Sequence, residues 1–123
     1  MGLGETSNVV YMVDFGLVTK FRSNTTGEHI PLRRNNCLLG TAQYASINAH
    51  KGIELTRRDD LEALGYLILY FYMGTLPWKG ATRNNNSDFF KRVLNVKEAL
   101  SPEKLCKECP NEFAVYIKYV KGL

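Results

Sequence analysis

The chain has 123 residues, enough for one domain, and 45% of them are hydrophobic, which excludes a disordered chain. Its formal net charge of +4 is spread along the chain without a long basic run, so we expect no nucleic-acid partner. Three cysteines without a secretory leader favour a reducing compartment, cytoplasmic or nuclear, and no apolar stretch is long enough for a membrane partner.

The first predicted element is a short buried strand. Residues 9–13 are β-branched or aromatic except for one methionine, and they run directly into Asp14-Phe15-Gly16. A carboxylate at the end of a rigid strand can hold Mg²⁺, while the apolar neighbour packs and the glycine lets the backbone move. Residues 9–16 are therefore a candidate magnesium site, although the tripeptide alone also fits an ordinary turn.

Residues 17–56 show no helical or strand periodicity and are punctuated by glycine and proline. A loop of this length inside a compact domain usually serves a function. It contains the second motif, Gly40-Thr41-Ala42-Gln43-Tyr44-Ala45-Ser46-Ile47-Asn48. We therefore expect an ordered functional segment here rather than a linker.

A central helix is predicted over residues 60–73, with Asp59 or Asp60 as its cap and Gly74 at its end. Its apolar residues occur nearly all round, which is typical of a helix buried on every side. One face carries Leu61, Leu64, Gly65, Ile68, Phe71 and Tyr72.

The remaining helices are predicted within residues 87–120. One begins at Ser87 and runs to about residue 94, a short one follows Ser101-Pro102, and the last covers residues 111–120. The apolar residues expected on one face of the last helix are Phe113, Val115, Tyr116, Tyr119 and Val120. Between the central helix and these helices, residues 76–80 (Leu-Pro-Trp-Lys-Gly) are predicted to form a turn.

Four motifs stand in the order found in protein kinases: Asp14-Phe15-Gly16, the segment at 40–48, Arg57-Arg58-Asp59-Asp60 with the six residues after it, and the turn at 76–80. Ser46-Ile47-Asn48 resembles the casein kinase I replacement for the usual Ala-Pro-Glu, so the chain resembles that family over nearly its whole length. The resemblance implies a mainly α fold with a short β segment, a partial protein-kinase-like C-terminal lobe. It also implies an enzyme that transfers the ATP γ-phosphate to serine or threonine of protein substrates.

The resemblance also implies roles for single residues. Asp14 resembles the metal-binding aspartate, so Asp14, Phe15 and Gly16 are the expected cofactor site for Mg²⁺ and ATP. Residues 17–39 resemble the activation loop. Thr41 resembles the docking-loop threonine that contacts the catalytic aspartate. Asp60 resembles the aspartate that tethers the catalytic loop, and a helix cap explains it equally well.

Six residues are candidate substrate contacts: Thr41, Gln43, Tyr44, Arg57, Arg58 and Lys79. Solvated surface charge explains the three cations equally well. The family usually has arginine at Gln43 and lysine at Asn36 and Phe89, and these cations resemble a pocket for a phosphorylated or acidic residue. A neutral amide makes no charge-assisted pair with phosphate, which puts a preference for phosphorylated substrates in doubt.

The sequence holds no glycine-rich loop, ATP-site lysine or catalytic His-Arg-Asp loop. We therefore expect this chain alone to be inactive and to bind Mg²⁺ and ATP poorly. We also expect it to aggregate or stay loosely packed, because the central helix would lack part of its packing partners. The alternatives are a truncated, pseudokinase-like binding module and a non-functional gene fragment.

Three weaker signals carry no function. Cys106-Lys107-Glu108-Cys109 has the spacing of one zinc-ligand pair, but a structural zinc site usually needs two such pairs. His29 and His50 fall in loop regions, where a solvated or capped histidine is the default expectation. Trp78 is expected to anchor packing rather than to bind a ligand.

Overall fold

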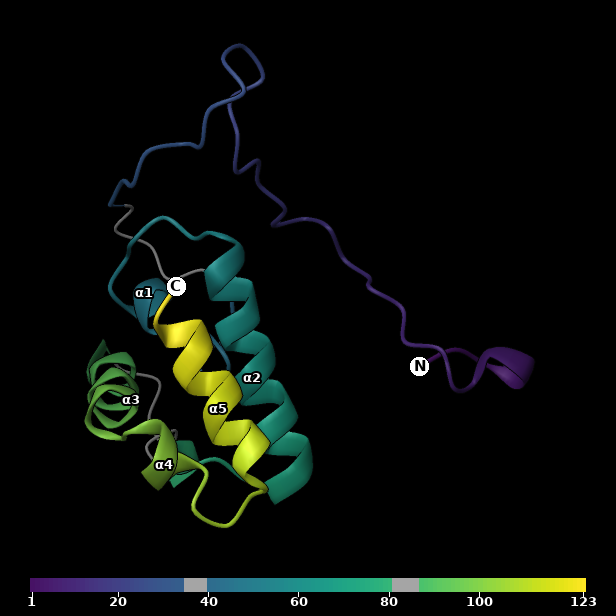
Figure 1. Cartoon of the computed structure of the whole chain (residues 1–123), viewed down its shortest axis with the longest axis vertical. Coiled ribbons are helices and arrows are strands. Elements are labelled where there is room, and N and C mark those ends of the chain that lie inside the picture. The colour runs from purple at the N-terminus through teal and green to yellow at the C-terminus, as the bar shows by residue number, and fades with distance from the viewer. Residues whose placement is uncertain (35–39, 81–86) are drawn as a thin grey trace. The chain divides into compact units, whose positions relative to one another are not determined.

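The computed structural model describes residues 1–34, 40–80 and 87–123, and the side chains of residues 87 and 88 lie outside this description (Figure 1). The contacts divide the chain into two compact units, Met1–Ile30 and Pro31–Leu123. The element order is η1 (Gly4–Thr6), α1 (Ile47–His50), α2 (Arg57–Met73), α3 (Ser87–Ala99), α4 (Pro102–Leu105) and α5 (Asn111–Lys121). The prediction of a mainly helical chain is confirmed.

The N-terminal unit is organised by short-range backbone hydrogen bonds. The Gly2 N–H donates to the Val9 carbonyl at 2.9 Å, which closes a loop around η1. Farther along, an antiparallel bridge between Arg22 and His29 closes a second turn, within which Ser23 Oγ accepts backbone N–H groups. The unit is thus a series of local turns.

The predicted buried strand at residues 9–13 is wrong. These residues form no strand, and Val10 and Met12 are 77% and 83% exposed. β-branched and aromatic side chains favour extended backbone, but a strand also needs a neighbouring strand that pairs its N–H and C=O groups. Across the described ranges the only β pairings are isolated bridges, and no sheet forms.

Helix α2 begins earlier than predicted and has a different cap. Thr56, with extended backbone, is the N-cap, and the Asp59 carboxylate at the third helical position accepts the Thr56 N–H at 2.9 Å. In this capping box, the side chain at the third helical position accepts the backbone N–H of the N-cap residue. Asp59 therefore supports the N-cap but is not the N-cap residue, and Asp60 lies inside the helix. The predicted end at Gly74 is confirmed, since Gly74 has φ 72°, a conformation that glycine adopts without strain.

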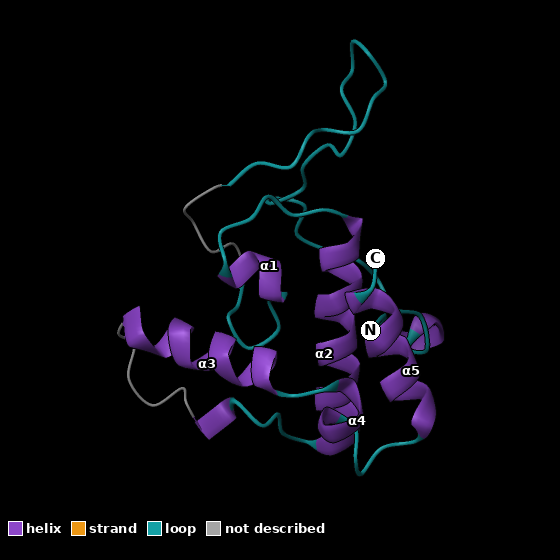
Figure 2. Ribbon diagram, turned by 60° about the vertical axis from the view of Figure 1, so that its left-hand side comes forward, coloured by secondary structure: helices purple, strands orange, loops and turns teal. Residues whose placement is uncertain are grey.

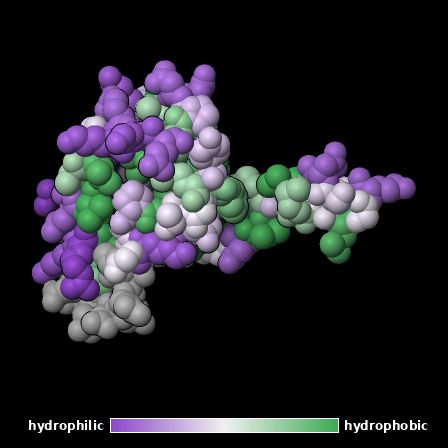
Figure 3. Space-filling model, turned by 90° about the horizontal axis from the view of Figure 1, so that it is seen from below, coloured by the Kyte–Doolittle hydropathy of each residue, from purple (hydrophilic) through white to green (hydrophobic). Residues whose placement is uncertain are grey.

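The prediction that this helix is buried on every side is wrong. The buried face of α2 carries Asp59, Glu62, Gly65, Tyr66 and Leu69. The exposed apolar face carries Leu61, Leu64, Ile68, Phe71 and Tyr72. Figure 3 shows apolar side chains at the surface beside hydrophilic ones. The predicted apolar stripe therefore faces outward, with Gly65 as its one buried member, and two acidic residues lie on the inner face.

The later helices follow the prediction more closely. α3 runs five residues beyond the predicted end, and α4 begins at Pro102 with the Ser101 hydroxyl accepting the Lys104 N–H. α5 matches its predicted range to within one residue, but Val115 and Tyr119 are exposed rather than on the packed face. Irregular structure over 17–56 is interrupted by the one-turn helix α1.

The core of the second unit forms where the helices meet. α5 runs alongside α2, and α3 crosses them at a steep angle, with α1 packed on α2 and α3 (Figure 2). The buried cluster comprises Tyr66, Leu69, Leu76, Trp78, Val93, Leu105, Cys106 and Ile117. The turn at 76–80 inserts Trp78, which confirms its predicted packing role. No helix within the described ranges is both long and apolar enough to cross a membrane.

We predict that Gly65→Ala destabilises the second unit. A Cβ at Gly65 would lie 2.6 Å from Ile117 Cδ1 and 2.9 Å from Tyr116 Cε1. The Tyr116 ring is held in place by its hydroxyl, which donates to the Leu61 carbonyl at 2.9 Å. Overpacking of this kind costs roughly 1–3 kcal/mol, which exceeds the gain of about 1 kcal/mol from replacing a helical glycine.

Thermal unfolding followed by circular dichroism measures this effect, with Gly80→Ala as the matched control, because a Cβ there meets no atom of the described residues within 4 Å. An unfolding midpoint for Gly65→Ala equal to or above that of Gly80→Ala would contradict the described packing of α5 on α2.

Candidate functional site

The candidate site is built around residues 41–51, here called the 41–51 segment. Its first turn is closed by the Tyr44 and Ala45 N–H groups, which both donate to the Thr41 carbonyl. Ser46 then caps α1, because its Oγ accepts the Ala49 N–H at 3.0 Å. A run of small residues lets this segment approach the helices closely: Ala42, Ala45, Ser46 and Ala49 are all buried.

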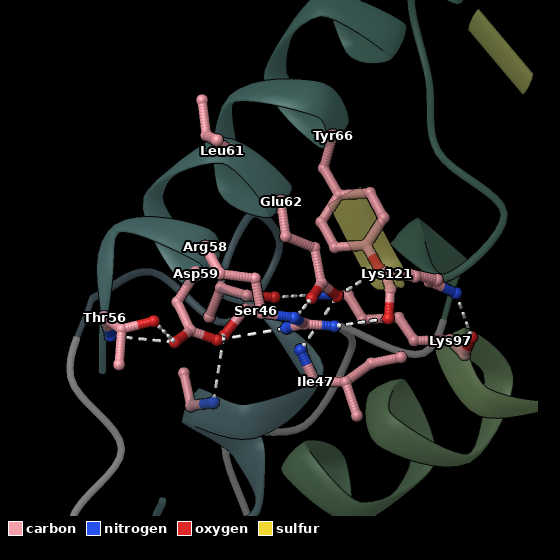
Figure 4. A network of polar contacts seen from close by, with 12 residues as sticks. Ser46, Ile47, Thr56, Arg58, Asp59, Leu61, Glu62, Tyr66, Lys97 and Lys121 are labelled. Atoms are coloured by element: carbon pink, nitrogen blue, oxygen red, sulfur yellow. Dashed lines mark hydrogen bonds and ion pairs between the residues drawn. The ribbon is translucent and has the colours of Figure 1, made fainter. Parts of the chain in front are cut away.

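Two carboxylates on the first turns of α2 bind the start of α1 (Figure 4). Ser46 Oγ donates to Asp59 Oδ1 at 2.8 Å, and the Ile47 N–H donates to Glu62 Oε1 at 3.0 Å. The second contact places a fully buried negative charge at the beginning of α1, next to a backbone N–H that has no partner within the helix. Residues separated by more than ten positions are thereby fixed to each other.

The two carboxylates are in turn neutralised within α2. Arg58 Nη1 donates to Glu62 Oε2 at 2.6 Å and lies 3.2 Å from Asp59 Oδ1. The Tyr66 hydroxyl donates to Glu62 Oε1 at 2.7 Å, and burial together with the Glu62 charge holds the Tyr66 pKa well above its ordinary value. Each buried charge therefore has a partner, as burial requires.

Lys97 of α3 binds the 41–51 segment from the other side. Its Nζ donates to the Ala42 and Ala45 carbonyls at 2.9 and 2.6 Å. The same ammonium group lies 4.8 Å from the Tyr66 ring centre and 4.9 Å from that of Trp78, within cation–π distance. Burial lowers the Lys97 pKa to about 7, with Glu62 acting to raise it and Lys121 to lower it.

His50 and Trp78 complete the contacts. His50 Nε2 lies 3.1 Å from the Ala42 carbonyl and 3.2 Å from Lys97 Nζ. Burial, followed by the Lys97 charge, lowers the His50 pKa to about 4, against smaller raising effects of Ala42 and Glu62. Trp78 Nε1 donates to the Gln43 carbonyl at 2.8 Å. Of the two expected states, solvated or capped, His50 is therefore the capped one: it is half-buried, and its ring nitrogen lies within hydrogen-bond distance of the Ala42 carbonyl.

The structure places the predicted substrate contacts unevenly. Thr41 is exposed, and Gln43 and Tyr44 are half-buried beside it. The Tyr44 ring packs edge-on against Tyr70 at 5.8 Å, and Lys79 Nζ lies 5.9 Å from the Tyr70 ring centre, so these two predicted contacts approach one aromatic side chain.

The two arginines at the start of α2 differ. Arg57 is exposed, whereas Arg58 already donates to both carboxylates and to the Lys121 carbonyl. These internal bonds favour a structural role for Arg58. Asp60 is exposed, and partial burial together with the neighbouring Asp59 charge raises its pKa.

The residues predicted to bind Mg²⁺ and ATP lie in the N-terminal unit. Asp14 has φ 64°, in the left-handed region, and its Oδ1 accepts the Gly16 N–H at 3.3 Å. Phe15 is 65% exposed. Among the described residues, no three histidine, cysteine, aspartate or glutamate side chains gather as a ready metal site.

Of the positions where the sequence departs from the family pattern, Asn36 lies outside the described residues and Phe89 packs half-buried against the core.

Cys106 is a buried, unpaired thiol and Cys109 a half-buried one. Burial raises the pKa of both thiols, to about 11 for Cys106.

Sequence reasoning missed most of the residues that organise the site, above all Glu62, Lys97 and Ser46 as a pairing residue. One signal was readable: Arg58, Glu62 and Tyr66 recur at four-residue spacing, which places them on one helix face. For Lys97 no local signal exists, because the backbone carbonyls that it binds lie more than forty positions away. No protein-family model matches the sequence.

We predict that Glu62→Ala destabilises the second unit by about 3 kcal/mol, since truncation leaves the Arg58 charge and the Ile47 N–H without their partner. Urea unfolding followed by circular dichroism measures the loss. Glu108→Ala, at an exposed position, is the matched control and leaves the unfolding midpoint unchanged. Equal midpoints for the two variants would show that Glu62 does not hold the segment.

Proposed function

We propose that this chain is the activation-segment and C-terminal-lobe portion of a casein kinase I-like serine/threonine protein kinase. In its full-length form the enzyme transfers the ATP γ-phosphate to protein substrates, in the cytoplasm or nucleus. The motif order from Asp14-Phe15-Gly16 to the turn at 76–80 supports the proposal. Phosphate transfer belongs to the full-length form, because residues 1–123 include no glycine-rich loop and no His-Arg-Asp.

The observation that carries the proposal is the anchoring of the 41–51 segment. Phosphoryl transfer depends mainly on positioning, so a segment that docks a substrate hydroxyl has to be held rigidly. Buried charged groups hold this segment from two helices, Asp59 and Glu62 on α2 and Lys97 on α3, while Thr41 stays exposed. That is the arrangement expected of a docking loop.

Asp14 fits the role of a magnesium ligand. Its carboxylate is exposed, and among the described residues it accepts a hydrogen bond from the Gly16 N–H at Oδ1, which leaves Oδ2 open. Mg²⁺ in such enzymes is typically held by one or two carboxylates together with substrate phosphates. The ion would neutralise charge on the transferred phosphate, and Asp14 would orient it.

The proposed acceptor is a protein hydroxyl group whose neighbours need not be phosphorylated. Gln43 offers a neutral amide where the family usually has arginine, and half-buried Phe89 replaces a lysine with an apolar ring. Neither side chain makes a charge-assisted bond to phosphate. Recognition would then rest on the remaining surface around Thr41 and Tyr44.

The exposed apolar face of α2 favours a second candidate, a pseudokinase-like binding module. Phe71 and Tyr72 are 73% and 55% exposed, and apolar side chains gathered on one helix face are a common means of docking a partner. A module of this kind would bind its partner through this face and transfer no phosphate.

The two candidates are separated by an activity assay on the full-length protein, whose coding sequence is established from the 5′ end of the transcript. We predict an upstream His-Arg-Asp and measurable phosphate transfer from ATP to casein. Asp14→Asn lowers that transfer by about 100-fold or more, because a metal ligand is lost. The 123-residue chain alone transfers none.

Glu108→Gln, another loss of one negative charge at an exposed position, is the control and retains full activity. Activity that survives Asp14→Asn, or a complete transcript without His-Arg-Asp, contradicts the kinase proposal. In the second case the binding module remains, and a stable partner retained by the chain but lost on Phe71→Ser supports it.

A further inference from the structure

We propose that His50 and Lys97 form an acid-sensitive latch that holds the 41–51 segment against the helices. The device is independent of phosphate transfer, since it concerns only how the segment is held. Two nitrogens that both accept protons lie 3.2 Å apart here, His50 Nε2 on α1 and Lys97 Nζ on α3. Lys97 is only 1% exposed and His50 is half-buried, so water screens the pair less than it would at the surface.

The hydrogen bonds accommodate a charged Lys97 together with a neutral His50 ring. A charged Lys97 has three protons, and the structure provides three acceptors: the carbonyls of Ala42 and Ala45 and the His50 ring nitrogen. In the alternative tautomer, the His50 Nε2–H donates to the Ala42 carbonyl at 3.1 Å and Lys97 keeps its two carbonyls. The first arrangement requires a neutral imidazole, because Nε2 accepts a proton from Lys97, and in the second only Nδ1 is left to take up a further proton.

A second proton on His50 has no place in this arrangement. An imidazolium carries N–H groups at both ring nitrogens. The Nε2–H keeps the Ala42 carbonyl, but the added proton lies on Nδ1, which is buried without a hydrogen-bond partner among the described residues, and the ring charge lies beside the Lys97 ammonium group. Protonation of His50 therefore disfavours the packing of α1 beside Lys97.

The surrounding charges do not relieve this conflict. On α2, the Glu62 and Asp59 carboxylates are already bound by Arg58. On α5, Lys121 Nζ lies 3.4 Å from the Lys97 carbonyl and adds positive charge. The remaining nearby ions pair with each other across α1 and α3, Lys51 with Glu98.

The pKa shifts have the sign that this geometry requires. The His50 pKa is lowered from 6.5 to about 4 in the docked arrangement, so a released segment binds more protons in that interval. Docking therefore weakens as the pH falls from 6.5 through 4. The Lys97 pKa is lowered from 10.5 to about 7, so proton uptake by Lys97 also weakens docking as the pH falls, but at higher pH. Between pH 6.5 and pH 4, the group whose proton uptake weakens docking is His50.

Trp78 reports on the latch directly. It is the chain's single tryptophan, it is fully buried, and its indole N–H binds the Gln43 carbonyl inside the segment. Release of the segment exposes this ring and breaks this bond. The emission of Trp78 then shifts to longer wavelength while α2, α3 and α5 keep their helical circular dichroism.

The test is an acid titration of the 123-residue chain, from above pH 6.5 down to pH 4, followed by both signals. We expect the Trp78 emission to shift within this interval while the helical signal is retained. His50→Gln, which keeps a neutral hydrogen-bonding side chain, abolishes the shift. His29→Gln makes the same change in the N-terminal unit and leaves it intact.

A Trp78 emission shift that persists in His50→Gln overturns the latch. Wild-type emission that stays constant over the interval overturns it too, as does emission typical of a solvent-exposed tryptophan already at the start of the titration. If His50→Gln fails to fold, proton NMR of the wild-type chain decides, with the His29→Gln spectrum assigning the two histidines. The latch requires the His50 ring and the Trp78 emission to change with one midpoint; different midpoints overturn it.

Discussion

The need to satisfy two buried charges governs the second unit. The Glu62 carboxylate is fully buried and the Lys97 ammonium nearly so, and each binds backbone groups of the 41–51 segment. A buried charge without partners costs several kcal/mol, so the fold forms only when this segment supplies them. α2 supplies one of these charges and α3 the other. Together they hold the 41–51 segment in a defined place, although most of the segment has no regular secondary structure.

The elements that depend on local chemistry were predictable from the sequence, and those that depend on distant partners were not. Gly74 ends α2 and Ser101 caps α4 through contacts within a few residues, and both were predicted correctly. Residues 9–13 are rich in residues that favour strands, but among the described residues no strand lies beside them to pair with. The apolar composition of α2 indicated a helix buried on every side. The inner face instead carries Glu62, whose carboxylate pairs with Arg58 and accepts the Ile47 N–H, which a leucine at this position could not do.

The resemblance named exposed and half-buried residues of the candidate site, and sequence reasoning missed the buried residues that hold them in place. Thr41, Gln43 and Tyr44 follow from a motif, which local sequence displays. Lys97 and His50 become partners only when α1 packs on α3, which no spacing reveals. In the kinase that we propose, the 41–51 segment would position the substrate, and ionisable groups hold this segment, so substrate positioning would depend on protonation.

The central claim, that buried charges fix the 41–51 segment, is tested most directly by amide hydrogen exchange. The Ile47 N–H binds Glu62 and the Ala49 N–H binds Ser46, so neither is satisfied by the four-residue helix α1 alone. The account predicts that both amides exchange as slowly as those in the middle of α2 at neutral pH. Exchange at the rate of an unprotected amide, while α2 stays protected, would contradict it.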